Sequence, residues 1–193
     1  MRKKKLGNGS LRRLSKVELA IFVCVPAGFD YIMRMEKGAV FKVGVISDTH
    51  GELDPRVLEI FGGVNHILHA GDIGMPYLIL KLEEIAPVTA ISGNNDEGLE
   101  YKETEMIELA SRKFLLHHIV EIGKEKTKIS RKIIRENPDV VVFGHSHQPF
   151  CENIGNTLYL NPGYAGKQRF NLKRTVAILH CDAEGMTAEF HDL

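Results

Sequence analysis

The stretch Phe41-Lys-Val-Gly-Val-Ile-Ser-Asp-Thr-His50-Gly51 decides how the rest of the chain is interpreted. Its apolar, β-branched run predicts a buried strand, which stops abruptly before Asp48 and His50. Side chains two positions apart lie on the same side of an extended chain, so we expect Asp48 and His50 to point the same way. A carboxylate and an imidazole placed like this can bind a metal. Taken alone, a turn-forming Asp at an ordinary strand end is the commoner explanation.

Four further predicted strands end in polar side chains of the same kind. These strands are expected at Val64–Ala70, Val88–Ile91, Lys113–His118 and Val140–Phe143. They lead to Gly71-Asp72, Gly93-Asn94-Asn95-Asp96, Leu116-His117-His118 and Gly144-His145-Ser146-His147. Sites in open α/β sheets form at the carboxyl ends of the strands. Five such ends in order indicate one shared metal site, and the His-x-His after a buried strand is the most specific part of the signal.

The remaining pattern predicts the order of the elements. Helices are expected at Asp54–Phe61, Pro76–Glu84 and Ile129–Glu136, and further strands at Thr104–Leu109, Phe150–Asn153, Thr157–Leu160, Thr175–Cys181 and Met186–Phe190. Strand–helix alternation in the first half predicts a parallel sheet. The closely spaced strands of the second half predict mostly antiparallel pairing. The chain is therefore expected to be a mixed α/β protein, and 193 residues suffice for one such domain.

The formal net charge of zero hides an asymmetry between the two ends of the chain. Residues 1–38 hold nine Lys or Arg and three Asp or Glu, an excess of six positive charges, which leaves residues 39–193 with six excess negative charges. We expect residues 1–38 to be a basic extension with little fixed structure before about Ala39. A mis-called start, with Met33 or Met35 as the true first residue, and a signal peptide around the apolar run Leu19–Val25 are alternatives. Residues 39–193 are expected to form the functional domain.

The three cysteines, Cys24, Cys151 and Cys181, are odd in number and widely spaced. This spacing favours neither a disulfide framework nor a zinc ribbon, and a cytoplasmic location is expected. The apolar run Leu19–Val25 is too short to span a membrane, and we expect no membrane partner. Residues 39–193, the acidic body of the chain, have no basic tract that could bind a polynucleotide backbone, which argues against a nuclease.

The motif order Asp-x-His, Gly-Asp, Gly-Asn-x-Asp, His, Gly-His-x-His resembles the calcineurin-like metallophosphoesterase superfamily. Its small single-domain prokaryotic phosphodiesterases are the most similar members, and the resemblance runs from about Lys42 to the C-terminus. It implies a four-layer α/β/β/α sandwich, in which two mixed sheets pack face to face with the helices outside.

The resemblance also implies a site that holds two divalent metal ions. Asp48, His50 and His147 would bind one ion, Asp72 would bridge to the second, and Asn94, His118 and His145 would complete the second. Carboxylates and imidazoles suit Mn, Fe, Ni, Co or Zn, with Mn favoured. The implied activity is hydrolysis of small phosphodiesters, and of phosphomonoesters as a second class, by a metal-bridging hydroxide. The residues expected to act in catalysis are Asp72, Asn94 and Asp96.

Three positions depart from the family pattern. His117-His118-Ile119 stands where the family has His-Gly, so either histidine could be the ligand, and we favour His118. Asn95 stands where many members have a histidine that acts as general acid. Tyr164 replaces the serine in the family's Asn-Pro-Gly-Ser loop. Because the ligand positions are filled, we favour an enzyme over the alternative of a non-catalytic scaffold on the same fold, as in the retromer subunit that resembles these enzymes. A homodimer is compatible with the sequence but not required by it.

Overall fold

The computed structural model describes residues 40–124, 126–169 and 171–193. These residues form ten strands and three helices: β1 Phe41–Ile46, α1 Arg56–Ile60, β2 His66–His69, α2 Tyr77–Glu83, β3 Val88–Ala90, β4 Thr104–Leu109, β5 Arg112–His117, α3 Lys128–Glu136, β6 Val140–Val142, β7 Phe150–Ile154, β8 Thr157–Asn161, β9 Thr175–Cys181 and β10 Met186–Asp192. Each predicted element is present, with ends that differ by a few residues. The predicted extension over residues 1–38, with its two alternatives, lies outside the described residues.

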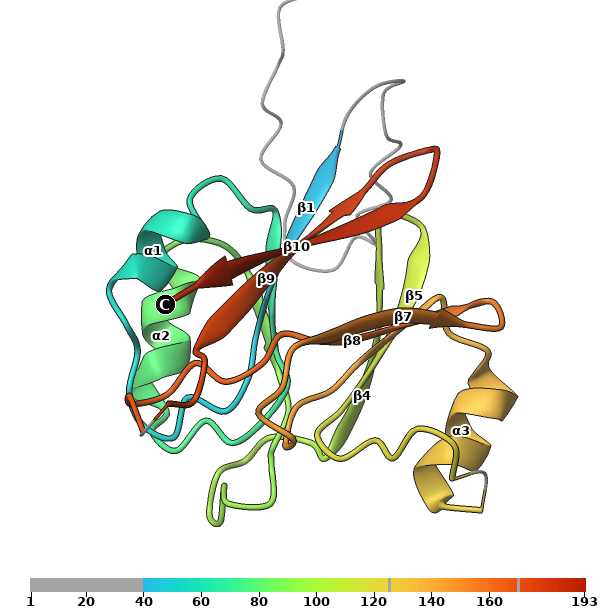
Figure 1. Ribbon diagram of the computed structural model, residues 1–193, viewed down its shortest axis with the longest axis horizontal. Coiled ribbons are helices and arrows are strands. Elements are labelled where there is room, and N and C mark those ends of the chain that lie inside the picture. Colours follow the sequence, from blue (N-terminus) through green and yellow to red (C-terminus); the bar gives the residue numbers. More distant parts are fainter. Residues whose placement is uncertain (1–39, 125, 170) are drawn as a thin grey trace, which may run out of the picture. The chain divides into compact units, whose positions relative to one another are not determined.

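The strands form two five-stranded sheets (Figure 1). The first sheet has the order β10-β9-β1-β2-β3 and the second has the order β4-β5-β6-β8-β7. In the first sheet β1, β2 and β3 are parallel, and their register pairs Val45 with Leu68 and Leu68 with Thr89. The parallel first half predicted from strand–helix alternation is therefore confirmed. It brings the loops after all three strands to one edge of the sheet.

The prediction of mostly antiparallel pairing in the second half is confirmed, with a parallel exception at the centre of the second sheet. The neighbouring strands β4 and β5, β7 and β8, and β9 and β10 do pair antiparallel. At the centre of the second sheet, however, β5, β6 and β8 are parallel. The reason is that α3 carries the chain back between β5 and β6, while β7 does so between β6 and β8. This parallel centre places the ends of β5 and β6 beside each other.

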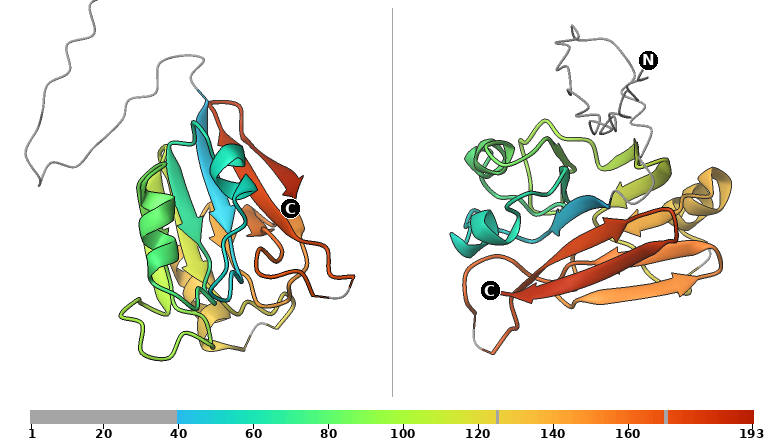
Figure 2. Two further views of the ribbon diagram at one scale, coloured as in Figure 1. Left: turned by 90° about the vertical axis from the view of Figure 1, so that its left-hand side faces the viewer. Right: turned by 90° about the horizontal axis from the view of Figure 1, so that it is seen from above.

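Three apolar clusters separate four layers, as the predicted α/β/β/α sandwich requires. The largest cluster lies between the sheets and includes Val43 and Val45 of β1 with Phe114 and Leu116 of β5. A second cluster joins the first sheet to α1 and α2, and a third joins the second sheet to α3. Successive side chains of β5 point to opposite faces of the sheet. Phe114 and Leu116 therefore belong to the cluster between the sheets, whereas Leu115 belongs to the third cluster. Figures 1 and 2 show α1 and α2 on one side of the sheets and α3 on the other.

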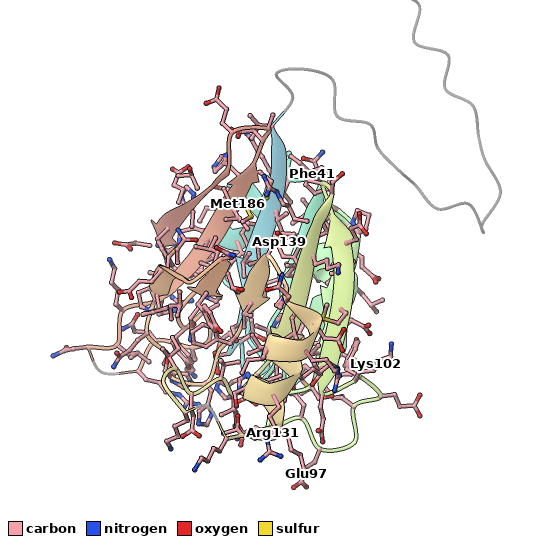
Figure 3. All side chains as sticks on the ribbon, turned by 90° about the vertical axis from the view of Figure 1, so that its right-hand side faces the viewer. Phe41, Glu97, Lys102, Arg131, Asp139 and Met186 are labelled. Atoms are coloured by element: carbon pink, nitrogen blue, oxygen red, sulfur yellow. The ribbon has the colours of Figure 1, made fainter. Side chains whose placement is uncertain are left out.

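Local sequence sets where the helices begin and end. Thr127 caps α3 by accepting a hydrogen bond from the Ser130 N–H at 3.0 Å, and Asn137 ends the helix in the left-handed region. Asp54 similarly accepts a hydrogen bond from the Arg56 N–H at 3.0 Å, next to Pro55 at the start of α1. Figure 3 shows α3 as an outer layer, with exposed Arg131 labelled on it. None of the helices in the described part of the chain is long and apolar enough to cross a membrane.

Replacing Phe114 by alanine should lower the free energy of unfolding by about 3–5 kcal/mol, because the ring is fully buried between the two sheets. Urea denaturation followed by circular dichroism measures the change. The matched control is Ile134→Ala on α3, where 71% of the side chain is exposed and the loss should stay below about 1 kcal/mol. Equal losses in the two variants would contradict the assignment of the core between the sheets.

Candidate metal centre

Five loops meet where the parallel strands of both sheets end. They follow β1, β2 and β3 of the first sheet and β5 and β6 of the second. The loop after β1 is hydrogen-bonded to the loop after β2 through Asp48 N–H to Gly71 O at 3.0 Å and His50 N–H to Asp72 O at 2.9 Å. The loop after β6 is tied to the end of β5 by Gly144 N–H to His118 O at 3.0 Å. All the predicted ligand side chains stand on these five loops.

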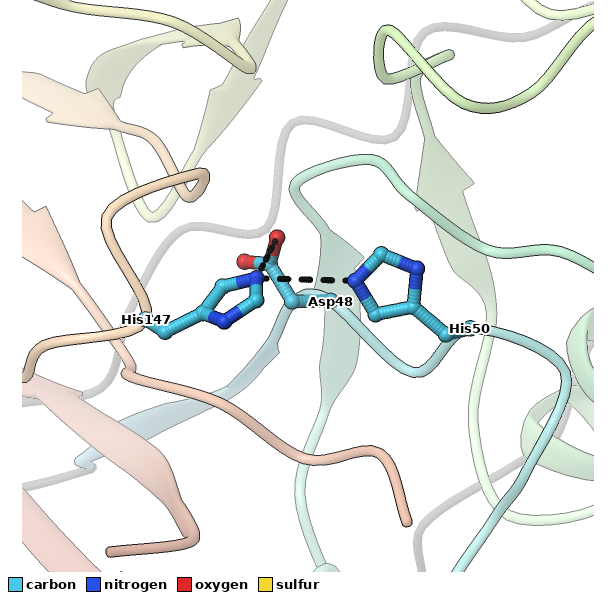
Figure 4. Close-up of side chains that lie close together, drawn as sticks. All are labelled: Asp48, His50 and His147. Carbon is cyan, nitrogen blue, oxygen red and sulfur yellow. Dashed lines mark hydrogen bonds and ion pairs between the residues drawn. The ribbon is translucent and has the colours of Figure 1, made fainter. Parts of the chain in front are cut away.

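The first group of potential metal ligands consists of Asp48, His50 and His147 (Figure 4). The Nε2 atoms of His50 and His147 lie 3.5 Å apart, and His147 Nε2 lies 3.3 Å from Asp48 Oδ1. Two ligands of one tetrahedral ion with bonds near 2.0–2.1 Å are separated by about 3.4 Å. The observed spacing therefore suits one shared ion.

The second group consists of Asp48, Asp72 and His118. His118 Nε2 lies 3.4 Å from Asp72 Oδ2 and 3.8 Å from Asp48 Oδ1. The opposite ring nitrogen, Nδ1, donates to Ala70 O at 2.7 Å, so that the neutral ring would have its lone pair on Nε2. That Nε2 is buried and has no hydrogen-bond partner among the described residues. A buried acceptor aimed at two carboxylates is the arrangement that a metal ion would satisfy.

The electrostatics of the two carboxylates also fit a bound cation. Asp48 and Asp72 are almost fully buried, and among the described residues only histidines lie within ion-pair distance of them. Burial raises the pKa of Asp48. Burial acts in the same direction on Asp72, but His118 and two hydrogen bonds from Asn95 outweigh it and hold the pKa of Asp72 below its usual range. Adjacent buried carboxylates without Lys or Arg partners need a cation to offset their charge.

The pKa values of His147 and His118 are shifted in opposite directions, and only the shift at His147 favours metal binding. Burial lowers the pKa of the His147 imidazole, which favours the neutral ring that a metal requires. Burial also acts to lower the pKa of His118, but the nearby Asp72 and Asp48 carboxylates outweigh it and raise the pKa of this ring. A metal bound at His118 would therefore have to displace a proton that the carboxylates attract.

The backbone at the ligand positions differs from the extended chain that the sequence pattern predicted. β1 ends at Ile46, and Asp48 and His50 have φ values of 56° and 47°. The two side chains do meet in one ligand group as expected, but left-handed backbone conformations, and not alternation along an extended strand, bring them together. Asp72, His145 and His147 also adopt positive φ, at 53°, 67° and 57°. Such values are uncommon outside glycine and collect at functional sites, where surrounding contacts hold them.

The loop after β3 contains the three predicted residues Asn94, Asn95 and Asp96. Asn94 is exposed, and its side chain forms no hydrogen bond with any described residue. Asn95 instead contacts Asp72, through its N–H to Oδ1 at 2.9 Å and its Nδ2 to Oδ2 at 2.6 Å. Sequence reasoning considered Asn95 only as a missing general acid, because nothing in the pattern signals that its amide reaches Asp72.

Asp96 is buried and organises the loops around the site. Its carboxylate accepts hydrogen bonds from the N–H groups of Ile73, Gly74 and Gly93, at 3.0, 2.8 and 2.8 Å. The bonds from Ile73 and Gly74 connect the loop after β3 to the residues directly following Asp72, and the bond from Gly93 lies within the loop after β3. The arrangement assigns Asp96 to holding the loops in place.

The structure places His117 and His118 on opposite sides of β5. His118 faces Asp72, whereas His117 Nδ1 lies 2.9 Å from Glu103 O and 2.8 Å from Thr104 Oγ1, away from the site. His145 is exposed, and its ring centroid lies 5.4 Å from that of His118. The backbone N–H of His145 donates to Asp48 Oδ2 at 3.1 Å. His145 thus lies beside the second ligand group without joining it.

Two glycines allow the loops to approach the carboxylates closely. A methyl group added at Gly93 would overlap the carboxylate of Asp72, and one added at Gly144 would lie 2.6 Å from Asp48 Oδ2. No other side chain fits at these two positions without displacing a predicted ligand. The glycines in the Gly-Asn and Gly-His motifs are therefore explained by close approach.

Comparisons with known proteins identify the family to which this fold belongs. Residues 41–184 match the family model described as the calcineurin-like phosphoesterase superfamily domain. A probable metallophosphoesterase of Methanothermobacter thermautotrophicus is 34% identical over 155 residues, which cover 76% of this chain and 90% of that protein. A protein named as a phosphodiesterase from Methanocaldococcus jannaschii is 30% identical over 141 residues, covering 63% of this chain and 82% of that protein.

Among solved structures, a conserved uncharacterized protein of Streptococcus pneumoniae, given as a predicted phosphoesterase, superposes with a TM-score of 0.65. The two chains share 26% sequence identity, and the match covers 80% of this chain and 90% of that one. The chain belongs to the calcineurin-like phosphoesterase superfamily. It has the α/β sandwich fold of that superfamily and two groups of potential metal ligands.

His69 should make the stability of the fold depend on pH. The Thr49 hydroxyl donates to Ile73 O at 3.0 Å, so His69 Nε2–H must donate to Thr49 Oγ1, while His69 Nδ1 accepts from the Gly71 N–H at 3.3 Å. A proton on Nδ1 would remove that acceptor, and burial lowers the pKa of His69 to about 4. In the unfolded chain His69 has a pKa near 6.5, so it binds a proton at a pH where the folded protein keeps His69 neutral. The free energy of unfolding therefore falls as the pH is lowered from about 6.5 toward 4.

Urea denaturation of the metal-free protein at pH 7.0 and 4.5 measures this effect. His69 should contribute a loss of about 2–3 kcal/mol between the two pH values, which the His69→Gln variant should lack. An equal pH dependence in both proteins would show that His69 titrates normally in the folded state.

Proposed function

We propose that the chain is a metal-dependent phosphodiesterase whose two divalent ions are held by the two ligand groups. One observation carries the proposal: Asp48 belongs to both groups, and His118 Nε2 is buried, unpaired and aimed at the carboxylates. One metal would be held by Asp48, His50 and His147. The second would be held by Asp72 and His118 of the second group, with Asn94 and His145 added from the neighbouring loops and with Asp48, which the two groups share, within reach of both ions. Asp72 Oδ2 also lies 3.8 Å from His50 Nε2, which supports its role as the bridge between them.

Bound divalent ions would polarise the phosphoryl oxygens and lower the pKa of an attacking water molecule. The protein's own contribution is to hold the site rigidly before the substrate arrives. Asn95 fixes both oxygens of Asp72, and Asp96 fixes the loops on either side. Asn94 could turn toward a second ion because its side chain forms no competing hydrogen bond with the described residues. We therefore assign Asp72 and Asn94 to the reacting centre, and Asp96 to positioning.

Three further parts of the proposal concern substrate, metal and location. Small phosphodiesters are favoured because the acidic body of residues 39–193 would repel a polynucleotide backbone, and because the Methanocaldococcus relative is named as a phosphodiesterase. Manganese is favoured by the mixture of carboxylates and imidazoles. A cytoplasmic location is in keeping with Cys151 and Cys181, which are both free.

Replacing Asp72 by asparagine should weaken metal binding by about 10–100-fold and lower the hydrolysis of bis(p-nitrophenyl) phosphate with Mn²⁺ by at least about 100-fold. The physical reason is the loss of a buried negative charge between His50 and His118. Metal content by mass spectrometry and the rate of nitrophenol release are measured together. The matched control is Asp192→Asn, which removes an exposed carboxylate paired with Lys173 and should change neither quantity.

The same assay separates an enzyme from a binding scaffold. Wild-type protein that holds two ions but hydrolyses neither diesters nor monoesters with any divalent metal would indicate a scaffold. Protein that binds no metal would contradict the metal centre itself.

Aryl phosphodiesters should be cleaved about 10²–10⁴-fold faster than alkyl phosphodiesters at the same metal concentration. Asn95 cannot protonate a leaving oxygen, and its amide is already hydrogen-bonded to Asp72. Leaving groups that depart as stable anions do not need a general acid, so their cleavage is not slowed by its absence. The ratio of aryl to alkyl cleavage is measured from the rates of matched aryl and alkyl diesters. The Asn95→His variant should have a smaller ratio than the wild type. Similar rates for both classes in the wild type would show that another group supplies the proton.

A further inference from the structure

We infer that Tyr164 is a positioning residue, which holds the imidazoles of His50 and His147 in the orientation that one metal ion of the site requires. The inference rests on the proposed function, because it presumes that these two rings bind a metal. Tyr164 is fully buried and is the largest fully buried side chain of the described residues. It follows Pro162 and Gly163 in the segment after β8.

The aromatic ring of Tyr164 contacts both imidazoles. Its centroid lies 4.6 Å from that of His147 and 5.9 Å from that of His50, at interplanar angles of 34° and 42°. The two imidazoles are 5.5 Å apart and nearly perpendicular, so the three rings form one cluster. His50 and His147 come from different loops, and Tyr164 is the side chain that packs on both.

The hydroxyl of Tyr164 is directed away from the ligands. It donates a hydrogen bond to Lys167 O at 3.0 Å, which gives the phenol a partner outside the metal site. The ring, and not the hydroxyl, is therefore the part of the side chain that acts on the imidazoles. A serine at this position, as in the family loop, could not make either ring contact.

The segment Tyr164–Lys167 is itself fixed against the loop that carries Asp48. Ala165 N–H donates to Ser47 O at 3.2 Å, and Thr175 N–H donates to Tyr164 O at 2.9 Å. A methyl group at Gly166 would lie 2.8 Å from Thr49 O and 2.9 Å from Asp48 O, so the two backbones are in direct contact.

Arg174 secures the other end of the segment. Its Nε donates to Gly166 O at 2.6 Å, and its guanidinium forms an ion pair with Asp54 at 3.0 Å. A ring anchored on both sides can restrict the side-chain rotation of its neighbours. Hydrogen-bonding groups that orient metal-binding histidines change metal affinity by about 10–100-fold when removed, and we expect a packing ring that fixes the same rings to act on that scale.

The test is a metal titration of three variants, with Mn²⁺ bound per chain counted by electron paramagnetic resonance and calorimetry. Tyr164→Phe keeps the ring and should bind two ions with affinities within about twofold of the wild type. Tyr164→Leu should weaken one of the two ions by about 10–100-fold and leave the other unchanged. The matched control is Phe61→Leu, which removes a fully buried ring in the α1 layer and should lower the melting temperature without changing either metal affinity.

Each other outcome has a defined meaning. Two ions bound as tightly by Tyr164→Leu as by the wild type would overturn the inference while leaving the proposed function intact. Equal weakening in the Phe and Leu variants would also overturn it, since the hydroxyl would then be responsible. Wild-type protein that binds no Mn²⁺ would instead contradict the proposed function. Should the Leu variant fail to fold, Tyr164→Met fills the space without a ring and is held to the same criterion.

Discussion

The burial of two carboxylates side by side, without a fixed cation, is the constraint on which the rest of the structure depends. Asp48 and Asp72 are almost completely withdrawn from water, and only histidines lie within ion-pair distance of them in the described part of the chain. Such an arrangement is costly unless a positive charge is supplied from outside. The surrounding loops reduce the cost through directed hydrogen bonds, including those from Asn95 to Asp72 and from His145 to Asp48.

The double-sheet architecture explains how candidate metal ligands so distant in sequence meet. The first sheet supplies Asp48, His50 and Asp72 from parallel strands, and the parallel centre of the second sheet supplies His118 and His147. The large apolar cluster between the sheets sets the distance between these two sets of loops. Stability of the core and geometry of the site are therefore linked through the same packed layer.

Around the candidate ligands lies a second set of residues that contact the loops and the ligand side chains. Asp96 holds the loops after β2 and β3, His69 holds Thr49 and Gly71, and Tyr164 packs against two imidazoles. The ligands themselves adopt backbone conformations that cost energy, with positive φ at Asp48, His50 and Asp72 among others. Strain of this kind persists only where neighbouring contacts are numerous, which accounts for the density of hydrogen bonds around these loops.

The amino-acid sequence by itself determined the elements, the parallel first sheet and the candidate ligands, because hydrophobic period and strand-end chemistry are local properties. It also indicated His118, through its place at the end of a buried strand. Only the tertiary structure decided how the chain turns at Asp48 and His50, which adopt left-handed conformations where alternation predicted an extended chain. It likewise decided that β5, β6 and β8 are parallel, that Asn95 binds Asp72, and that Tyr164 packs on His50 and His147. These features arise from contacts between segments far apart in the chain, and no local pattern encodes which partner a side chain will meet.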